Sequence, residues 1–176
     1  EKPVAILEAK LTPIGSLNGA LAGLSAHELG AVAIRAALEA ASIAPGEIDE
    51  AVLGQVLTAG QGMNPARQAS RAAGLPDTSP ALTINQVCGS GQRAVALAAQ
   101  QIMTDGAEIV VAGGQECMSN APHVDFIRHG KKLGDVTLRN TVMSEGLTDA
   151  FYGYPMGITA ENVAREFKIS REDQDQ

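Results

Sequence analysis

The chain contains 176 residues with a formal net charge of −7, and 45% of its residues are hydrophobic. This acidic balance argues against a surface that binds nucleic acid or anionic membranes. No stretch approaches the roughly 18 apolar residues of a membrane span, and the N-terminus lacks a signal-peptide pattern, so we expect a cytoplasmic protein. Because only 3% of the residues are aromatic, small aliphatic side chains must build the core.

The first part of the chain predicts a strand, a turn and a helix. Residues 4–9 are mostly apolar and predict the strand, and Thr12-Pro13-Ile14-Gly15 predicts the turn that ends it. Ser25 and Glu28 have the spacing of a capping box, which predicts a helix that runs to about Ser42. Its expected buried face consists of Leu29, Val32, Ala33, Ala36, Ala37 and Ala40.

Strands and helices then alternate. Residues 51–57, 81–87 and 109–112 predict strands, because they are short apolar runs with β-branched residues. Asn64-Pro65 predicts the start of a helix that stops at Gly74, and residues 93–104 predict another buried helix. This alternation predicts βαβ units and a parallel sheet.

A cysteine lies at the corner between the predicted strand 81–87 and the helix that follows it. Gly89 and Gly91 allow a sharp turn and close access to the backbone. Cys88 is therefore expected at a helix N-terminus, where unpaired N–H groups and the helix dipole favour the thiolate, which is the nucleophilic form. The same N–H groups could hold the oxyanion that forms when this sulfur attacks a thioester carbonyl.

Three other interpretations of this segment were weighed. A free cysteine is more often a small buried hydrophobic residue than a nucleophile. Residues 89–94 also fit the dinucleotide fingerprint G-x-G-x-x-A, but the required acidic residue would be Glu108, which precedes the next strand instead of ending it. A hydrolase nucleophile elbow needs G-x-S-x-G, whereas Cys88 and Gln92 stand where its glycines should be.

Two motifs resemble the thiolase family in its biosynthetic, acetyl-CoA acetyltransferase form. They are Asn-Gln-Val-Cys-Gly-Ser-Gly at residues 85–91 and Ala-Gly-Gly-Gln-Glu-Cys-Met-Ser at residues 112–119. The resemblance covers essentially the whole chain, with further matches at residues 12–15, 54–57, 64–68 and 156–162. Two positions depart from the family pattern: Leu11 stands where arginine is usual, and Pro155 where histidine is frequent.

The resemblance implies an α/β fold with a mixed, mainly parallel sheet. Residues 1–117 would form the N-terminal core without its last strands, and residues 118–176 would begin a loop domain over the active site. Cys88 would be the catalytic nucleophile, and Leu147 and Met156 would line the substrate pocket. Within the loop domain, residues 161–167 predict a short helix.

The activity implied by the resemblance is the condensation of two acetyl-CoA molecules to acetoacetyl-CoA and CoA, or the reverse thiolysis. Coenzyme A thioesters would be substrates, with no bound cofactor and no metal. The resemblance also implies a homodimer or homotetramer, and we expect its interface to use strand 81–87 and the loop 60–67, because an apolar strand with polar ends is safer paired than exposed.

In thiolases the base histidine and a second cysteine belong to the C-terminal half, so the resemblance implies that these 176 residues are part of a longer chain and are inactive alone. Of the histidines here, only His123 lies near a motif, while His27 and His129 do not, and Cys117 is expected to be a buried neutral thiol. Two alternatives remain: a non-catalytic fragment or degenerate subunit that acts in assembly, and another acyl-cysteine enzyme such as a ketoacyl synthase.

Overall fold

The computed structural model describes residues 2–176, which form two compact units, the first ending at Ala121 and the second comprising Pro122–Gln176. The first unit contains a three-stranded sheet and three α-helices. In chain order its main elements are α1 (Ala26–Ala41), β1 (Glu50–Gly54), α2 (Pro65–Ala73), β2 (Ala81–Ile84), α3 (Ser90–Met103) and β3 (Val110–Gly114). Short 3₁₀ turns at Pro45–Glu47 and Met118–Asn120 complete it.

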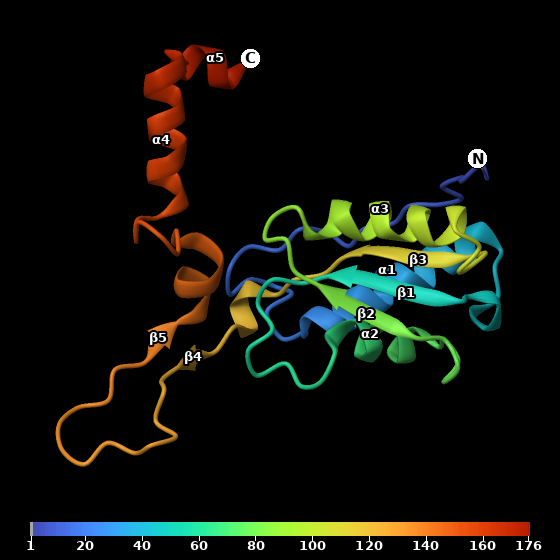
Figure 1. The fold of residues 1–176 in the computed structure, drawn as a ribbon, viewed down its shortest axis with the longest axis horizontal. Coiled ribbons are helices and arrows are strands. Elements are labelled where there is room, and N and C mark those ends of the chain that lie inside the picture. Colours follow the sequence, from blue (N-terminus) through green and yellow to red (C-terminus); the bar gives the residue numbers. More distant parts are fainter. Residues whose placement is uncertain (1) are drawn as a thin grey trace. The chain divides into compact units, whose positions relative to one another are not determined.

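The sheet is parallel, with strand order β2-β1-β3, which confirms the predicted parallel arrangement. Helix α3 covers one face, and α1 and α2 cover the other (Figure 1). Alternate residues of β1 face opposite sides of the sheet. Ala51 and Leu53 belong to the core cluster formed with α1 and α2, whereas Val52 is buried outside this cluster. The carboxyl ends of all three strands therefore lie at one edge of the sheet, next to the start of α3.

The predicted helix starts are confirmed. Ser25 caps α1: its hydroxyl oxygen accepts the Glu28 N–H, and the Glu28 carboxylate accepts the Ser25 N–H. Asn64 caps α2 by accepting the Arg67 N–H, and Gly74 ends that helix with a φ of +98°. A positive φ costs glycine little, which explains the stop at this residue.

Residues 4–9 do not form the predicted strand. A strand needs ladder hydrogen bonds to a neighbour, and the Ala9 N–H instead donates to the Glu8 carboxylate. Ile6 and Leu7 are largely exposed, so the apolar pattern of this segment is not matched by burial. The predicted turn at residues 12–15 is also displaced, because the first turn hydrogen bond joins the Gly19 N–H to the Ser16 carbonyl.

The predicted buried face of α1 is wrong as well. The helix buries Ala26, Gly30, Ala31, Ile34 and Leu38, while Val32 is about half exposed. Small and aliphatic residues lie on most sides of α1, so several of its faces are apolar and could pack against the core. The stripe with the long Ile34 and Leu38 side chains and the small Gly30 packs closest, because it interdigitates best with α2 and the sheet.

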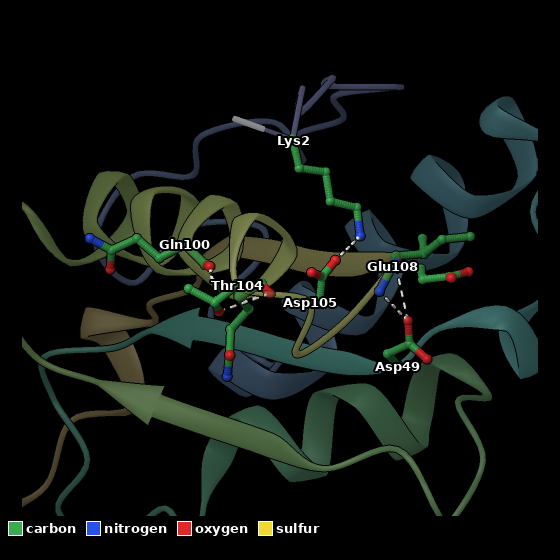
Figure 2. A network of polar contacts seen from close by, with 8 residues as sticks. Lys2, Asp49, Gln100, Thr104, Asp105 and Glu108 are labelled. Atoms are coloured by element: carbon green, nitrogen blue, oxygen red, sulfur yellow. Dashed lines mark hydrogen bonds and ion pairs between the residues drawn. The ribbon is translucent and has the colours of Figure 1, made fainter.

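A carboxylate joins the amino-terminal ends of β1 and β3. Asp49 accepts the N–H groups of Glu108 at 2.7 Å and of Ile109 at 3.0 Å (Figure 2). These two backbone hydrogen bonds lower the pKa of Asp49 below its ordinary value. Nearby, Lys2 pairs with the exposed Asp105 at 3.0 Å, but such a surface pair contributes little.

The second unit has its own short elements. Strands β4 (His123–Val124) and β5 (Arg139–Asn140) pair antiparallel, followed by a π-helical segment, Val142–Leu147. Helices α4 (Met156–Phe167) and α5 (Arg171–Asp175) follow. The helix predicted at residues 161–167 thus exists but begins earlier, because Pro155 sits at the N-cap and its fixed φ is compatible with a helix start. Among the described residues, no helix is long and apolar enough to cross a membrane.

Candidate active site

Cys88 lies between β2 and α3, at the edge where the parallel strands end. Its side chain is exposed, so a reagent or substrate can reach the sulfur. The preceding residue, Val87, has a φ of +49°, which is strained for a β-branched side chain. The strand stops at Ile84 and the helix starts at Ser90, so the corner takes up the residues that the sequence pattern assigned to a longer strand.

Ser90 ties this corner together from inside. Its hydroxyl oxygen accepts the Gln86 N–H at 2.8 Å and donates to the Val87 carbonyl at 2.6 Å. The side chain is only 4% exposed, so these bonds are shielded from competing water. Ser90 therefore holds the strained turn on both sides of the residue that precedes the cysteine.

The amino-terminal end of α3 faces this corner without a capping side chain. Its N-cap is Gly89, which offers no side-chain acceptor. Within residues 2–176, the amides of Gly91 and Gln92 donate to no protein acceptor. The predicted helix N-terminus after Cys88 is thus confirmed, and its unpaired N–H groups carry positive partial charge at the helix start that follows the cysteine.

Three glycines allow α3 to approach the strand ends. A Cβ built on Gly54, the last residue of β1, would lie 2.5 Å from the Ser90 Cβ. Gly91 and Gly114 face each other in the same way: a Cβ on Gly114 would lie 3.3 Å from the Gly91 Cα. Such close contacts exclude larger residues, so the glycines determine how near the first turn of α3 lies to the sheet.

A partly buried polar network, which the sequence patterns above do not predict, supports the same edge of the sheet. Glu116 accepts the Val56 N–H at 2.8 Å and the Leu57 N–H at 3.2 Å. Gln55 donates to the Leu57 carbonyl at 3.0 Å and accepts from Gln115 at 2.8 Å. The usable signal was the position of these polar residues, directly after buried strands, where parallel-sheet proteins place functional groups.

Burial raises the pKa of Glu116 above its ordinary value, although its hydrogen bonds with Val56 and Leu57 act in the opposite direction. The group keeps two strong donors at its oxygens, so its position is well determined. The Glu116 carboxylate hydrogen-bonds to backbone N–H groups and not to Cys88.

Cys117 is not the buried thiol that we expected. It is half-buried and lines a cavity of about 430 Å³ together with residues 10–17, α1 and the 3₁₀ turn at Met118–Asn120. The segment 10–17 forms no strand beside β3. It lines the cavity without filling it, so the Cys117 thiol stays partly exposed.

The predicted pocket residues Leu147 and Met156 lie in the second unit. They flank the antiparallel bridge between Thr148 and Pro155, so that bridge brings the two side chains to neighbouring positions. Each is about one-third exposed. Their role in a substrate pocket stays a prediction.

The three histidines lie in different elements. His27 lies in α1 and contacts the Ser25 hydroxyl, while His123 belongs to β4 and His129 to an exposed loop. Across residues 2–176, no cluster of histidine, cysteine and acidic side chains could hold a metal ion.

Comparison with known proteins agrees with this geometry. Residues 4–176 match the family described as thiolase, N-terminal domain. The chain is 57% identical over 173 residues to an acetyl-CoA acetyltransferase of Rhizobium meliloti (strain 1021), 54% identical to one of Shinella zoogloeoides, and 52% identical to a cytosolic acetyl-CoA acetyltransferase of Rattus norvegicus. Each alignment covers 98% of this chain and 44% of the relative, so the chain spans less than half the length of these curated relatives. The match over almost the entire chain confirms the predicted resemblance, and the protein belongs to the thiolase family.

Proposed function

We propose that the protein transfers an acetyl group between coenzyme A thioesters, condensing two acetyl-CoA molecules to acetoacetyl-CoA and CoA or running the reverse thiolysis. The observation that carries this proposal is the exposed Cys88 at the uncapped start of α3. Relatives named acetyl-CoA acetyltransferase, 52–57% identical to this chain, support the choice of substrate.

In the first step the Cys88 thiolate attacks the carbonyl carbon of acetyl-CoA. A bond forms between that carbon and the cysteine sulfur, and the bond to the coenzyme A sulfur breaks. The departing thiolate of coenzyme A takes up a proton. The unpaired amides of Gly91 and Gln92 favour this step, because N–H groups at a helix start can hold the negative charge that develops on the carbonyl oxygen.

In the second step the acetyl group leaves Cys88. A base removes a proton from the α-carbon of a second acetyl-CoA, and this carbon attacks the acyl-cysteine carbonyl. The new carbon–carbon bond yields acetoacetyl-CoA, and the cysteine leaves as a thiolate. The resemblance to thiolases implies that the base histidine belongs to the C-terminal half, so the proposal assigns the base to the part of the relatives' length that this chain does not cover.

The other sequence predictions extend this proposal. Residues 118–176 would begin a loop domain over the active site, with Leu147 and Met156 against the acyl group. The strand β2 is an edge strand of the sheet, and Leu82 on it is about half exposed, which supports a homodimer or homotetramer paired through this edge. A soluble, cytoplasmic enzyme agrees with the relatives from rat and mouse, which are named cytosolic.

Mass spectrometry of the purified protein after mixing with acetyl-CoA tests the proposal. We expect a mass increase of one acetyl group, located by peptide mapping on Cys88, and release of one equivalent of CoA. Cys88→Ala should lose both signals, whereas Cys117→Ala should keep them. An acetyl group on any other residue, or no adduct in the presence of excess acetyl-CoA, would exclude Cys88 as the acyl carrier.

A further inference from the structure

Glu116 hydrogen-bonds to the backbone of the segment that follows β1. It lies two residues beyond the end of β3, and its two carboxylate oxygens accept the successive N–H groups of Val56 and Leu57, at 2.8 and 3.2 Å. A carboxylate that accepts two adjacent amides holds a stretch of backbone in one orientation, because both bonds are charge-assisted. The Val56 peptide is therefore fixed relative to β3.

Val56 is in turn connected to the residue before the cysteine. Its carbonyl accepts the Asn85 side-chain N–H at 3.4 Å, the longest contact of the series, and the Asn85 side-chain oxygen accepts the Val87 N–H at 2.8 Å. The amide orientation of Asn85 follows from its partners, since its nitrogen faces a carbonyl and its oxygen faces an N–H. A continuous series of hydrogen bonds thus runs from Glu116 through Val56 and Asn85 to Val87.

Val87 needs such support. Its φ of +49° is strained for a β-branched residue and persists only when the surrounding structure holds it. Ser90 supports its carbonyl, and Asn85 supports its N–H. If the Asn85 contact is lost, Val87 can relax towards a negative φ, and the adjacent Cys88 would turn away from the start of α3.

We propose that Glu116 is a positioning residue for Cys88: through Val56 and Asn85 it holds Val87 in its left-handed conformation, and this keeps the sulfur at the start of α3. The inference rests on the proposed function in which Cys88 carries the acyl group. Glu116 is not a catalytic residue here, since its carboxylate hydrogen-bonds to the backbone amides of Val56 and Leu57.

The variant that tests this is Glu116→Gln in the full-length protein. Glutamine keeps the shape but turns an NH₂ group towards one of the two backbone donors, so one hydrogen bond is lost. We expect acetylation of Cys88, followed by the burst of CoA release, to slow about tenfold, which corresponds to about 1.4 kcal/mol of activation free energy. KM for acetyl-CoA should change little, and the rate of iodoacetamide labelling of Cys88 should fall.

Asp49→Asn is the matched control. Asp49 also accepts two successive N–H groups between β1 and β3, but at the opposite end of these strands (Figure 2). It should lower the melting temperature without slowing Cys88 acetylation. If the two variants slow acetylation in proportion to their loss of stability, Glu116 has only a structural role and the inference is wrong.

Rescue gives the decisive readout. Glycine adopts a positive φ at no steric cost, so Val87→Gly should remove the dependence on Glu116. We expect the double variant Glu116→Gln, Val87→Gly to recover most of the acetylation rate relative to Glu116→Gln. A Glu116→Gln rate equal to wild type, or a double variant as slow as Glu116→Gln, would overturn the inference.

The two proposals fail in different ways. If wild-type protein forms no acetyl-Cys88, the proposed function is wrong, while the rate of iodoacetamide labelling of Cys88 in Glu116→Gln still decides whether Glu116 positions the sulfur. If wild type forms the adduct and Glu116→Gln changes neither the acetylation rate nor the labelling rate of Cys88, only the positioning role is lost.

Discussion

Gly54 and Ser90 lie in direct backbone contact at the point where β1 ends and α3 begins. A Cβ on Gly54 would meet the Ser90 Cβ at 2.5 Å, the Ser90 carbonyl carbon at 2.6 Å and the Gly91 nitrogen at 2.8 Å. Two of these atoms belong to the backbone, which cannot rotate away as a side chain can. The position of the first turn of α3, and with it the cysteine corner, therefore depends on the absence of a side chain in β1.

Gly54→Ala should reduce both stability and Cys88 acetylation. Forcing a methyl group into a packed site costs about 1–3 kcal/mol, and here relief requires α3 to move away from the strand ends. Gly113→Ala is the matched control, because a Cβ at Gly113 in β3 would meet nothing within 4 Å. Urea unfolding and the CoA burst should separate the two variants. Equal effects would show that the close contact at Gly54 has no special role.

Asn64→Ala should destabilise the start of α2. The Asn64 side-chain oxygen accepts from the Arg67 N–H and the Thr83 hydroxyl, and its nitrogen donates to the Ala81 carbonyl. Loss of an N-cap costs about 0.5–2 kcal/mol, and the φ of +43° at this position adds strain for alanine.

Asn64→Asp is the control for this helix cap. Aspartate keeps the capping oxygen and loses only the donor to Ala81, so its loss of stability should be clearly smaller in the same urea titration. A loss equal to that of alanine would mean that the bond to β2, and not the cap, carries the effect.

The elements of the first unit could be predicted because short apolar runs and capping residues describe buried strands and helix ends directly. The segment 4–9 was mistaken for a strand because strand formation requires a paired neighbour, which local composition does not reveal. The prediction of the buried face of α1 was also wrong, because several faces of this helix are similarly hydrophobic and differ mainly in the shapes of their side chains. Gly30 illustrates this, since a Cβ there would overlap the Gln115 side-chain oxygen.

The corner that contains Cys88 could also be predicted, but the contacts that support this corner could not. The glycines beside Cys88 mark a corner, whereas Gln55, Gln115 and Glu116 look like ordinary polar residues that follow strands. Their function depends on contacts between positions about 60 residues apart, such as the hydrogen bond from Gln115 to Gln55. Such contacts follow from the register of β1 and β3, which a single sequence does not contain.

Glu116 and Asp49 should contribute to the pH dependence of the unfolding free energy with opposite signs. Burial raises the pKa of Glu116 above 4.5 in the folded protein. Its protonated form is thus favoured on folding, and its contribution to stability is full below pH 4.5 and is lost as the pH rises through the raised pKa. Relative to Glu116→Gln, wild-type protein should lose unfolding free energy across this window.

Asp49 should behave in the opposite way. The N–H groups of Ile109 and Glu108 lower its pKa below 3.8, so its contribution is present above pH 3.8 and is lost as the pH falls through the lowered pKa. Urea titrations of wild type, Glu116→Gln and Asp49→Asn over this acidic range would measure both differences. The same sign for both variants would contradict the assignment of burial as the dominant influence on Glu116.

The two cysteines should differ in chemistry although both can be reached by reagents. Cys88 is exposed beside the unpaired amides of α3, whereas Cys117 is half-buried and lines the cavity next to α1. Limiting iodoacetamide at neutral pH should therefore label Cys88 first. Prior acetyl-CoA should protect Cys88 by forming the thioester and leave the labelling of Cys117 unchanged. Peptide mapping that finds Cys117 labelled first, or acetyl-CoA protecting both thiols equally, would mean that exposure and the helix start do not make Cys88 the nucleophile.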